Sequence, residues 1–219
     1  GVTTVTITDE WARYTVILTA TATVTSNLRF MSGLANANLF AWGAQIEELS
    51  YATSYIPTSG TIATRLADLV TGAGDVNTFN STEGVLYAEI AALANDGAVR
   101  YLGLSDGSTT NRVIILYHNS DNSIRAIVSS GGVKYADISS SVTSSLDFHK
   151  VAIKWKLNDF SFWIDGIEVA TETVLSAPIG LDTLSFSIAA GSPFYGKTKT
   201  TAVFSEALTD EELTQLTTI

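Results

Sequence analysis

The chain has 219 residues, of which 46% are hydrophobic and 16% charged, and its formal net charge is −10. An acidic chain of this kind is a poor partner for nucleic acid, because phosphate binding needs a basic surface. It contains no cysteine, which excludes disulfides and thiolate metal sites, and no apolar run approaches the roughly 20 residues of a membrane span, so we expect no membrane insertion.

The first 50 residues alternate between apolar and polar positions like a small set of β-strands. Residues 2–24 alternate around Trp11, and the residues near Trp42 alternate again. A closed sandwich usually needs about seven strands or more. We therefore expect residues 1–50 to be a partial β jelly-roll segment, either the tail of a domain or a piece that completes its core against other subunits. Because the sequence starts at Gly1 in strand-like residues, we also expect a piece of a longer protein.

Residues 51–68 read as an irregular connector, in which Ile56-Pro57 favours extended backbone. Residues 69–219 then form a series of short strands separated by turns such as Asp106-Gly107, Gly131-Gly132 and Asp165-Gly166. This pattern favours an antiparallel sandwich. The predicted strands are Val85–Ala91, Arg100–Leu104, Val113–His118, Ile124–Ser129, Val133–Ile138, Val151–Lys156, Phe160–Ile164, Ile167–Ala170, Leu184–Ala189 and Thr198–Phe204.

One helix is predicted, from Asp210 to about Thr217. Thr209 is a good N-cap, Glu212 completes a capping box, and Leu208 and Leu213 fit a hydrophobic staple. The predicted fold is therefore all-β: an antiparallel β-sandwich with a short C-terminal helix, preceded by a partial β segment.

Two passages of the sequence resemble known families. FHKVAIKWKLNDFSFWIDGIEVAT, followed by GSPFYGKTKTTAVFSEALTDEELTQL, resembles the laminin-G-like or concanavalin A-like jelly roll of many bacteriophage tail proteins, over roughly residues 69–219. WARYTVILTATATV, followed by LFAWGAQIEELSYATSYIPTSGTIATRLAD, resembles the last strands of a carbohydrate-binding-type jelly roll with the connector found in phage tail fibres and tailspikes. The resemblance implies a virion protein that acts outside the host cell on cell-surface polysaccharide. It also implies a homotrimer, although no heptad repeat indicates one.

The sequence lacks the catalytic motifs of glucanases and of serine hydrolases. Glucanases of this fold resemble one another in a Glu-x-Asp-x-Glu strand that supplies acid and nucleophile, and no such run occurs here. His118 and His149 lack a nucleophile motif such as Gly-x-Ser-x-Gly, and His149 is interpreted as the start of a strand. The sequence therefore predicts a protein that is not an enzyme, with a polysaccharide-degrading domain as an alternative.

The resemblance also brings calcium into consideration, because laminin-G-like domains often hold it in rim loops. Asp106, Asn111, Asp121 and Asp165 lie in or near predicted turns and carry the oxygen ligands that Ca²⁺ takes. The simpler interpretation is that Asp and Asn cap their own turns. We therefore expect no required cofactor and keep calcium as an alternative.

Sugar recognition is the function that the aromatic positions favour. Flat rings on an open sheet face stack on pyranose rings, with polar side chains around them for the hydroxyls. Trp163, Tyr87 and Tyr101 are out of phase with the apolar positions of their strands, whereas Trp155 is in phase and belongs to the core. The expected ligand-binding residues are Trp163, Tyr87, Tyr101, Tyr117, His118, Arg125 and Tyr135.

Two functions remain open at this point. One is a non-catalytic, host-surface glycan-binding module of a tail fibre or tailspike. The other is a structural or oligomerisation module of the same particle. In that case the outward aromatic rings, Trp163 above all, are buried between subunits, under a loop or against the first segment.

Overall fold

The computed structural model describes residues 4–19, 39–48, 51–64, 73–118, 121–187 and 193–219. Contacts divide the chain into two compact units, residues 1–67 (unit 1) and residues 68–219 (unit 2). The predicted connector contributes residues 51–64 to unit 1. In the part of the chain that the structure describes, no helix is both long and apolar enough to cross a membrane.

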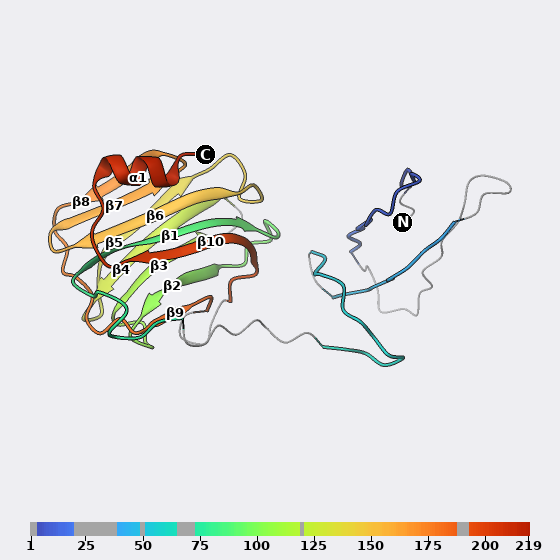
Figure 1. Ribbon diagram of the computed structural model, residues 1–219, viewed down its shortest axis with the longest axis horizontal. Coiled ribbons are helices and arrows are strands. Elements are labelled where there is room, and N and C mark those ends of the chain that lie inside the picture. Colours follow the sequence, from blue (N-terminus) through green and yellow to red (C-terminus); the bar gives the residue numbers. More distant parts are fainter. Residues whose placement is uncertain (1–3, 20–38, 49–50, 65–72, 119–120, 188–192) are drawn as a thin grey trace. The chain divides into compact units, whose positions relative to one another are not determined.

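Unit 2 consists of two five-stranded antiparallel sheets (Figure 1). Sheet A has the strand order β10-β1-β6-β7-β8, and sheet B has the order β5-β4-β3-β2-β9. Strands distant in the sequence therefore lie side by side, as β1 and β10 do. The strands are β1 (Glu83–Ala92), β2 (Arg100–Ser105), β3 (Arg112–His118), β4 (Ser123–Ser130), β5 (Val133–Ser141), β6 (His149–Lys156), β7 (Asp159–Ile164), β8 (Ile167–Glu172), β9 (Thr183–Ser185) and β10 (Gly196–Phe204).

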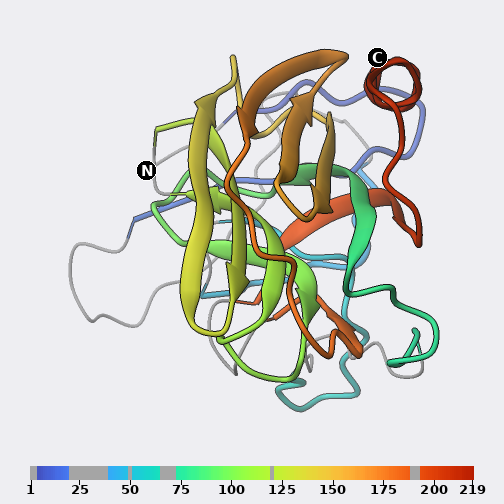
Figure 2. The same cartoon turned by 90° about the vertical axis from the view of Figure 1, so that its left-hand side faces the viewer.

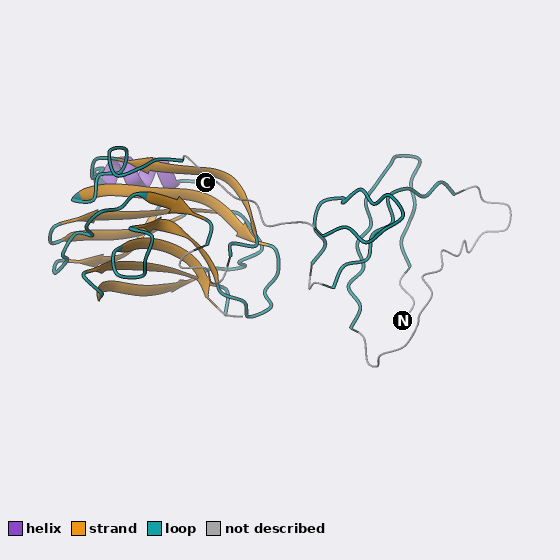
Figure 3. Cartoon of the chain, turned by 90° about the horizontal axis from the view of Figure 1, so that it is seen from below, coloured by secondary structure: helices purple, strands orange, loops and turns teal. Residues whose placement is uncertain are grey.

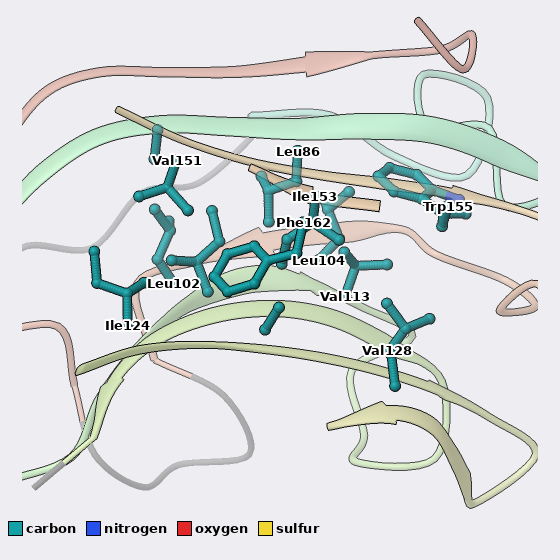
Figure 4. Packing of buried hydrophobic residues seen from close by; sticks show 14 of the residues in the cluster. Leu86, Leu102, Leu104, Val113, Ile124, Val128, Val151, Ile153, Trp155 and Phe162 are labelled. Atoms are coloured by element: carbon teal, nitrogen blue, oxygen red, sulfur yellow. The ribbon is translucent and has the colours of Figure 1, made fainter. Parts of the chain in front are cut away.

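The main core lies between the two sheets, where alternate residues of each strand point inward. Trp155, Phe160 and Phe162 of sheet A are fully buried there. Burying one such side chain contributes about 1.5–3 kcal/mol. Figure 4 shows the packing, with Leu86, Val151, Ile153, Trp155 and Phe162 from sheet A and Leu102, Leu104, Val113, Ile124 and Val128 from sheet B.

Helix α1 (Asp210–Thr217) packs on the outer face of sheet A, where it contacts β6, β7 and β8. It is seen end-on in Figure 2. The predicted capping box is present: Thr209 Oγ1 accepts from the Glu212 N–H, and the Glu212 side chain accepts from the Thr209 N–H at 2.8 Å. Leu208 and Leu213 both belong to the apolar cluster beneath the helix.

The predictions for unit 2 are confirmed. Each predicted strand is present, with ends that differ by a few residues, and the predicted helix is correct. β9 is shorter than expected, since it ends at Ser185; residues 188–189 of that predicted strand lie outside the described residues. His149 begins β6, and Trp155 belongs to the core, as predicted.

The strands expected in the first 50 residues are not found in the part that the structure describes. Residues 4–19 and 39–48 contain no strand, and Figure 3 draws them as loops. A strand exists only where a second backbone completes its ladder, and alternation in the sequence does not supply that partner. The partial β jelly-roll segment stays a prediction, because residues 1–3, 20–38 and 49–50 of it lie outside the described residues. Their large apolar side chains are exposed, including Trp11, Phe40, Trp42 and Ile46.

Candidate functional site

The outer face of sheet B brings polar and aromatic residues of several strands into register. Tyr101 of β2 lies opposite Leu116 of β3, which lies opposite Arg125 of β4, which in turn lies opposite Ser139 of β5. Within the described residues the only helix is α1, and it packs on the other sheet. The strands of sheet B curve with the core side chains on the convex side (Figure 4). The outer face is therefore the concave one.

A small apolar cluster forms the floor of this face. Ile114, Leu116 and Ile127 are buried although they point away from the main core, and Val99 and Tyr101 pack against them. Tyr101 is half-buried. Because Ile114, Leu116 and Ile127 are at most 5% exposed, they support this face from below, and the partly exposed ring of Tyr101 is the apolar surface on which a sugar could stack.

Two arginines flank this floor from neighbouring strands. Arg112 lies opposite Ser129 at one end, and Arg125 lies opposite Leu116 at the other. Arg112 Nε donates to Ser129 Oγ at the long distance of 3.5 Å. Arg125 Nε pairs with Asp137.

Asp137 is the carboxylate that balances this charge. Its other oxygen lies 2.9 Å from Lys134 Nζ. Partial burial acts to raise the pKa of Asp137, but the hydrogen bonds and charges of Arg125 and Lys134 hold it below its ordinary value. Asp137 is therefore ionised at neutral pH. The face as a whole offers guanidinium donors and the partly exposed aromatic ring of Tyr101, above a buried apolar floor.

The corresponding face of sheet A is closed, which corrects the expectation for Trp163 and Tyr87. Both residues point away from the main core, as their phase predicted, but each is only 5% exposed. They lie in the cluster with Leu213, beneath α1. Trp163 Nε1 donates to Ser161 Oγ at 2.9 Å, so its polar atom is also satisfied internally. Neither ring is available to a sugar in this structure.

Two further predicted ligand residues belong to the main core side of sheet B. Tyr117 is buried in the core, and its hydroxyl donates to the carbonyl of Ile90 at 2.9 Å. Burial raises the pKa of Tyr117. Tyr135 lies at a register shift in the β4–β5 pair and packs against the core from the edge. The side chain of His118 lies outside the described residues.

The predicted metal ligands lie on separate turns. Asp106 accepts from the Ser108 N–H and from Asn111 Nδ2 at 3.0 and 2.8 Å, and these bonds outweigh partial burial to lower its pKa. Asp121 accepts from Ser123 Oγ at 2.6 Å. Asp106 and Asp121 flank opposite ends of β3.

Asp165 belongs to the β7–β8 turn of sheet A, where its carboxylate lies 2.5 Å from His149 Nδ1 and accepts from the Lys150 N–H. Among the described residues, no three acidic, histidine or cysteine side chains gather as a metal site. Calcium stays a prediction.

Tyr101 and Arg125 of this face were predicted from the sequence, whereas Arg112 and the apolar floor were not. β3 reads RVIILYH, with apolar residues in both phases, so alternation does not say which side faces the core. A strand that is apolar in both phases indicates two covered faces. The apolar pattern of β3 therefore predicts a buried apolar layer on both faces of sheet B, but it does not predict which residues cover the outer one.

Comparisons with known proteins agree with this architecture. A family model described as "Concanavalin A-like lectin/glucanases superfamily" matches residues 73–214. A search of the curated proteins gives no match.

Among solved structures, the carbohydrate-binding module CBM40 of the Ruminococcus gnavus IT-sialidase bound to α2,3-sialyllactose is similar, with a TM-score of 0.52, 15% identity, and 63% of this chain and 84% of that chain covered. The same module bound to α2,6-sialyllactose has a TM-score of 0.52 and 14% identity, and the match covers 69% of this chain and 95% of that chain. The leech intramolecular trans-sialidase has a TM-score of 0.50 and 19% identity. The match covers 64% of this chain but only 24% of that enzyme. At these identities the likeness shows the fold alone.

Proposed function

The chain belongs to the concanavalin A-like lectin/glucanase superfamily, and we propose that it is a non-catalytic glycan-binding module whose ligand lies on the outer face of sheet B. The observation that carries the proposal is the arrangement of Arg112 and Arg125 on either side of an apolar floor bordered by Tyr101. The matching face of sheet A supports it by contrast, because α1 covers that face.

The proposed ligand is a glycan with an acidic sugar. Guanidinium groups bind carboxylates through charge-assisted, often bidentate hydrogen bonds. The Arg125–Asp137 contact uses Nε, and a guanidinium carries further N–H donors on its terminal nitrogens. The CBM40 neighbours, bound to sialyllactose, show that this fold accommodates a sugar with a carboxylate. Sialic acid or another acidic sugar is therefore the first ligand to test.

The chemistry of Asp137 supports a role without catalysis. A glycosidase needs a carboxylic acid whose pKa is raised, so that it protonates the leaving oxygen, and a second carboxylate opposite it. Asp137 lies on the proposed face with a lowered pKa and both oxygens paired. It is a poor general acid.

The biological setting of this proposal is a phage tail fibre or tailspike that binds polysaccharide on the host surface, as a trimer. Its support is the sequence resemblance of both units to such proteins. A structural or oligomerisation module is the second candidate. The exposed apolar side chains of unit 1, such as Ile7, Phe40 and Ile46, favour it. Light scattering on the purified chain tests the trimer, and a monomer at all concentrations would contradict it.

Calorimetric titration with α2,3-sialyllactose and with lactose tests the glycan proposal. We expect sialyllactose to bind at least about tenfold more tightly than lactose, because one charge-assisted hydrogen bond contributes about 1.5–3 kcal/mol. Arg112→Gln and Arg125→Gln should each remove most of that preference. Lys199→Gln is the matched control, since it removes a cation paired with Glu89 on sheet A.

Three results would overturn the proposal. The first is no binding of any acidic glycan by the assembled protein. The second is an equal loss of binding in the Lys199→Gln control, which would show a non-specific charge effect. The third is release of reducing sugar from host polysaccharide, which would make the protein an enzyme.

A further inference from the structure

We propose that unit 1 holds a second, separate ligand site: a pocket for a pyranose ring that carries a carboxylate, formed by Trp11, Arg13, Trp42 and Tyr55. These residues line a cavity of about 350 Å³, together with Ala12 and Gly43. Small-molecule pockets typically start at about 300 Å³. The inference concerns only described residues of unit 1 and does not depend on the proposed site on sheet B.

The walls of the pocket are aromatic and open to solvent. Trp11 is 75% exposed and Trp42 is 76% exposed. The Trp42 and Tyr55 ring centroids lie 4.7 Å apart with an interplanar angle of 41°, so the two rings support each other. Leaving large indole faces in water costs free energy that a ligand recovers on binding. Sugar rings present C–H faces of matching size to such aromatic surfaces.

A network of hydrogen bonds holds the pocket in shape from behind. Gln45 Oε1 accepts from the Ile56 N–H at 2.7 Å, and Gln45 Nε2 donates to Glu47. Glu47 in turn accepts from the Thr53 N–H at 3.2 Å. Gln45 and Glu47 therefore fasten the segment after Trp42 to the segment that carries Tyr55. Ordered walls of this kind reduce the entropy lost on binding.

Gly43 allows the close approach of the Tyr55 ring. Its φ of +68° lies in the left-handed region, and a Cβ there would lie 3.3 Å from Tyr55 Cε2. Any other residue at position 43 would be strained by the backbone and would press on the ring. Glycine at position 43 therefore lets the Tyr55 ring lie against the backbone where both line the pocket.

Arg13 gives the pocket its charge preference. It makes no hydrogen bond or ion pair with the described part of the chain. Its charge reaches Glu47: burial acts to raise the pKa of Glu47, but hydrogen bonds from Gln45 and Thr53 and the charge of Arg13 lower it. The Glu47 carboxylate is occupied by Gln45 and Thr53, so within the described residues the Arg13 donors are not used by Glu47. A free guanidinium beside aromatic rings favours a carboxylated sugar and disfavours a cation.

The chain contains four tryptophans, which makes the site directly observable. Trp11 and Trp42 line the pocket, whereas Trp155 and Trp163 are buried in unit 2. The full chain is labelled with 5-fluorotryptophan, and each ¹⁹F resonance is assigned from single Trp→Phe variants. D-Glucuronic acid and D-glucose are then titrated. We expect the Trp11 and Trp42 resonances to shift saturably with glucuronic acid and the other two to stay unchanged.

Two variants separate the roles of ring and charge. Arg13→Gln should weaken glucuronic acid at least about tenfold, the fold-change of one lost charge-assisted bond, and leave glucose unchanged. Trp42→Ala should weaken both sugars by a factor of about three to ten, as expected for a lost aromatic contact. Phe40→Ala is the matched control, because Phe40 is an exposed aromatic residue of the same unit that does not line the pocket.

The outcomes that would overturn the inference are equally specific. Absence of a saturable shift at Trp11 and Trp42 would do so, as would an Arg13→Gln variant that keeps the preference for glucuronic acid. A shift of these resonances on dilution without sugar would show that the rings contact a second copy of the chain instead. Binding lost in the Arg112 and Arg125 variants but unchanged in Trp42→Ala would leave sheet B as the sole site.

Discussion

The outer faces of the two sheets in unit 2 differ in what covers them. Sheet A carries Trp163 and Tyr87 beneath α1, and their rings are buried. Sheet B carries Tyr101, Arg112 and Arg125 around a buried floor, without a helix of the described chain over it. An aromatic residue that points away from the core is therefore buried under a helix on one sheet, whereas on the other sheet Tyr101 stays partly exposed.

This difference has a simple physical origin. The apolar side of α1 can be buried only against an apolar surface, and Val85, Ala152 and Trp163 provide one on sheet A. The same requirement does not apply to sheet B, whose outer face holds charged side chains around its floor. The helix thus covers the outer face of sheet A, and the outer face of sheet B is the one to which we assign the proposed glycan site.

Replacing Trp163 with alanine is expected to have the largest effect. It removes a buried indole between β7 and α1 and leaves the buried Ser161 hydroxyl without its donor, so unfolding should become easier by about 3–5 kcal/mol. Urea denaturation followed by circular dichroism measures this loss. The fraction that remains folded should bind sialyllactose as the unaltered protein does.

Trp163→Phe serves as the milder control and should lose less stability. The comparison of the two faces fails if Trp163→Ala keeps its free energy of unfolding but no longer binds glycan. In that case the helix would have to leave sheet A for the ligand.

Leu213→Ala tests whether helix α1 is what covers the outer face of sheet A. Leu213 is fully buried between α1 and sheet A, and its truncation should cost about 2–5 kcal/mol. Loosening of the helix should also expose Trp163, which acrylamide quenching of tryptophan fluorescence detects in a Trp11→Phe, Trp42→Phe background. Unchanged quenching despite lower stability would mean that something other than α1 shields the indole.

The sequence allowed the architecture of unit 2 to be predicted because burial leaves a period of two in each strand. The capping box at Thr209 and Glu212 fixed the helix for an equally local reason. What covers an outward side chain is not local: the assignment of Trp163 to a sugar failed because its partner, Leu213, lies 50 residues away in the sequence. Arg112 was missed since it begins a strand that is apolar in both phases.

Thr209→Ala is expected to have a moderate effect on the covered face. It removes the side-chain oxygen that accepts from the Glu212 N–H, and the loss of such a cap typically costs about 1 kcal/mol. Thermal unfolding measures the shift. Thr209→Ser, which keeps the hydroxyl, should restore most of the stability, and failure of that rescue would contradict a capping role.

Asp137→Asn is expected to have the smallest effect on stability, and it tests the open face. The Asp137 carboxylate pairs with Arg125 and Lys134 at the surface, so its loss should cost about 1 kcal/mol or less at pH 7. The pKa of Asp137 is lower in the folded protein than its ordinary value of 3.8. Its contribution is therefore present above that value and disappears as the pH falls through the lower, folded pKa.

The stability difference between the unaltered protein and Asp137→Asn should accordingly shrink toward zero as the pH falls below 3.8 and through the lower, folded pKa, as urea titrations at pH 7 and at low pH would show. Glycan binding at pH 7 should move in the opposite direction from stability. Replacing Asp137 with asparagine frees Arg125 Nε and removes a negative charge that repels an acidic sugar. Sialyllactose should therefore bind more tightly. Weaker binding in Asp137→Asn would mean that Asp137 holds Arg125 in its binding position. The outer face of sheet B would then depend on internal ion pairs for its arrangement, whereas the outer face of sheet A depends on packing.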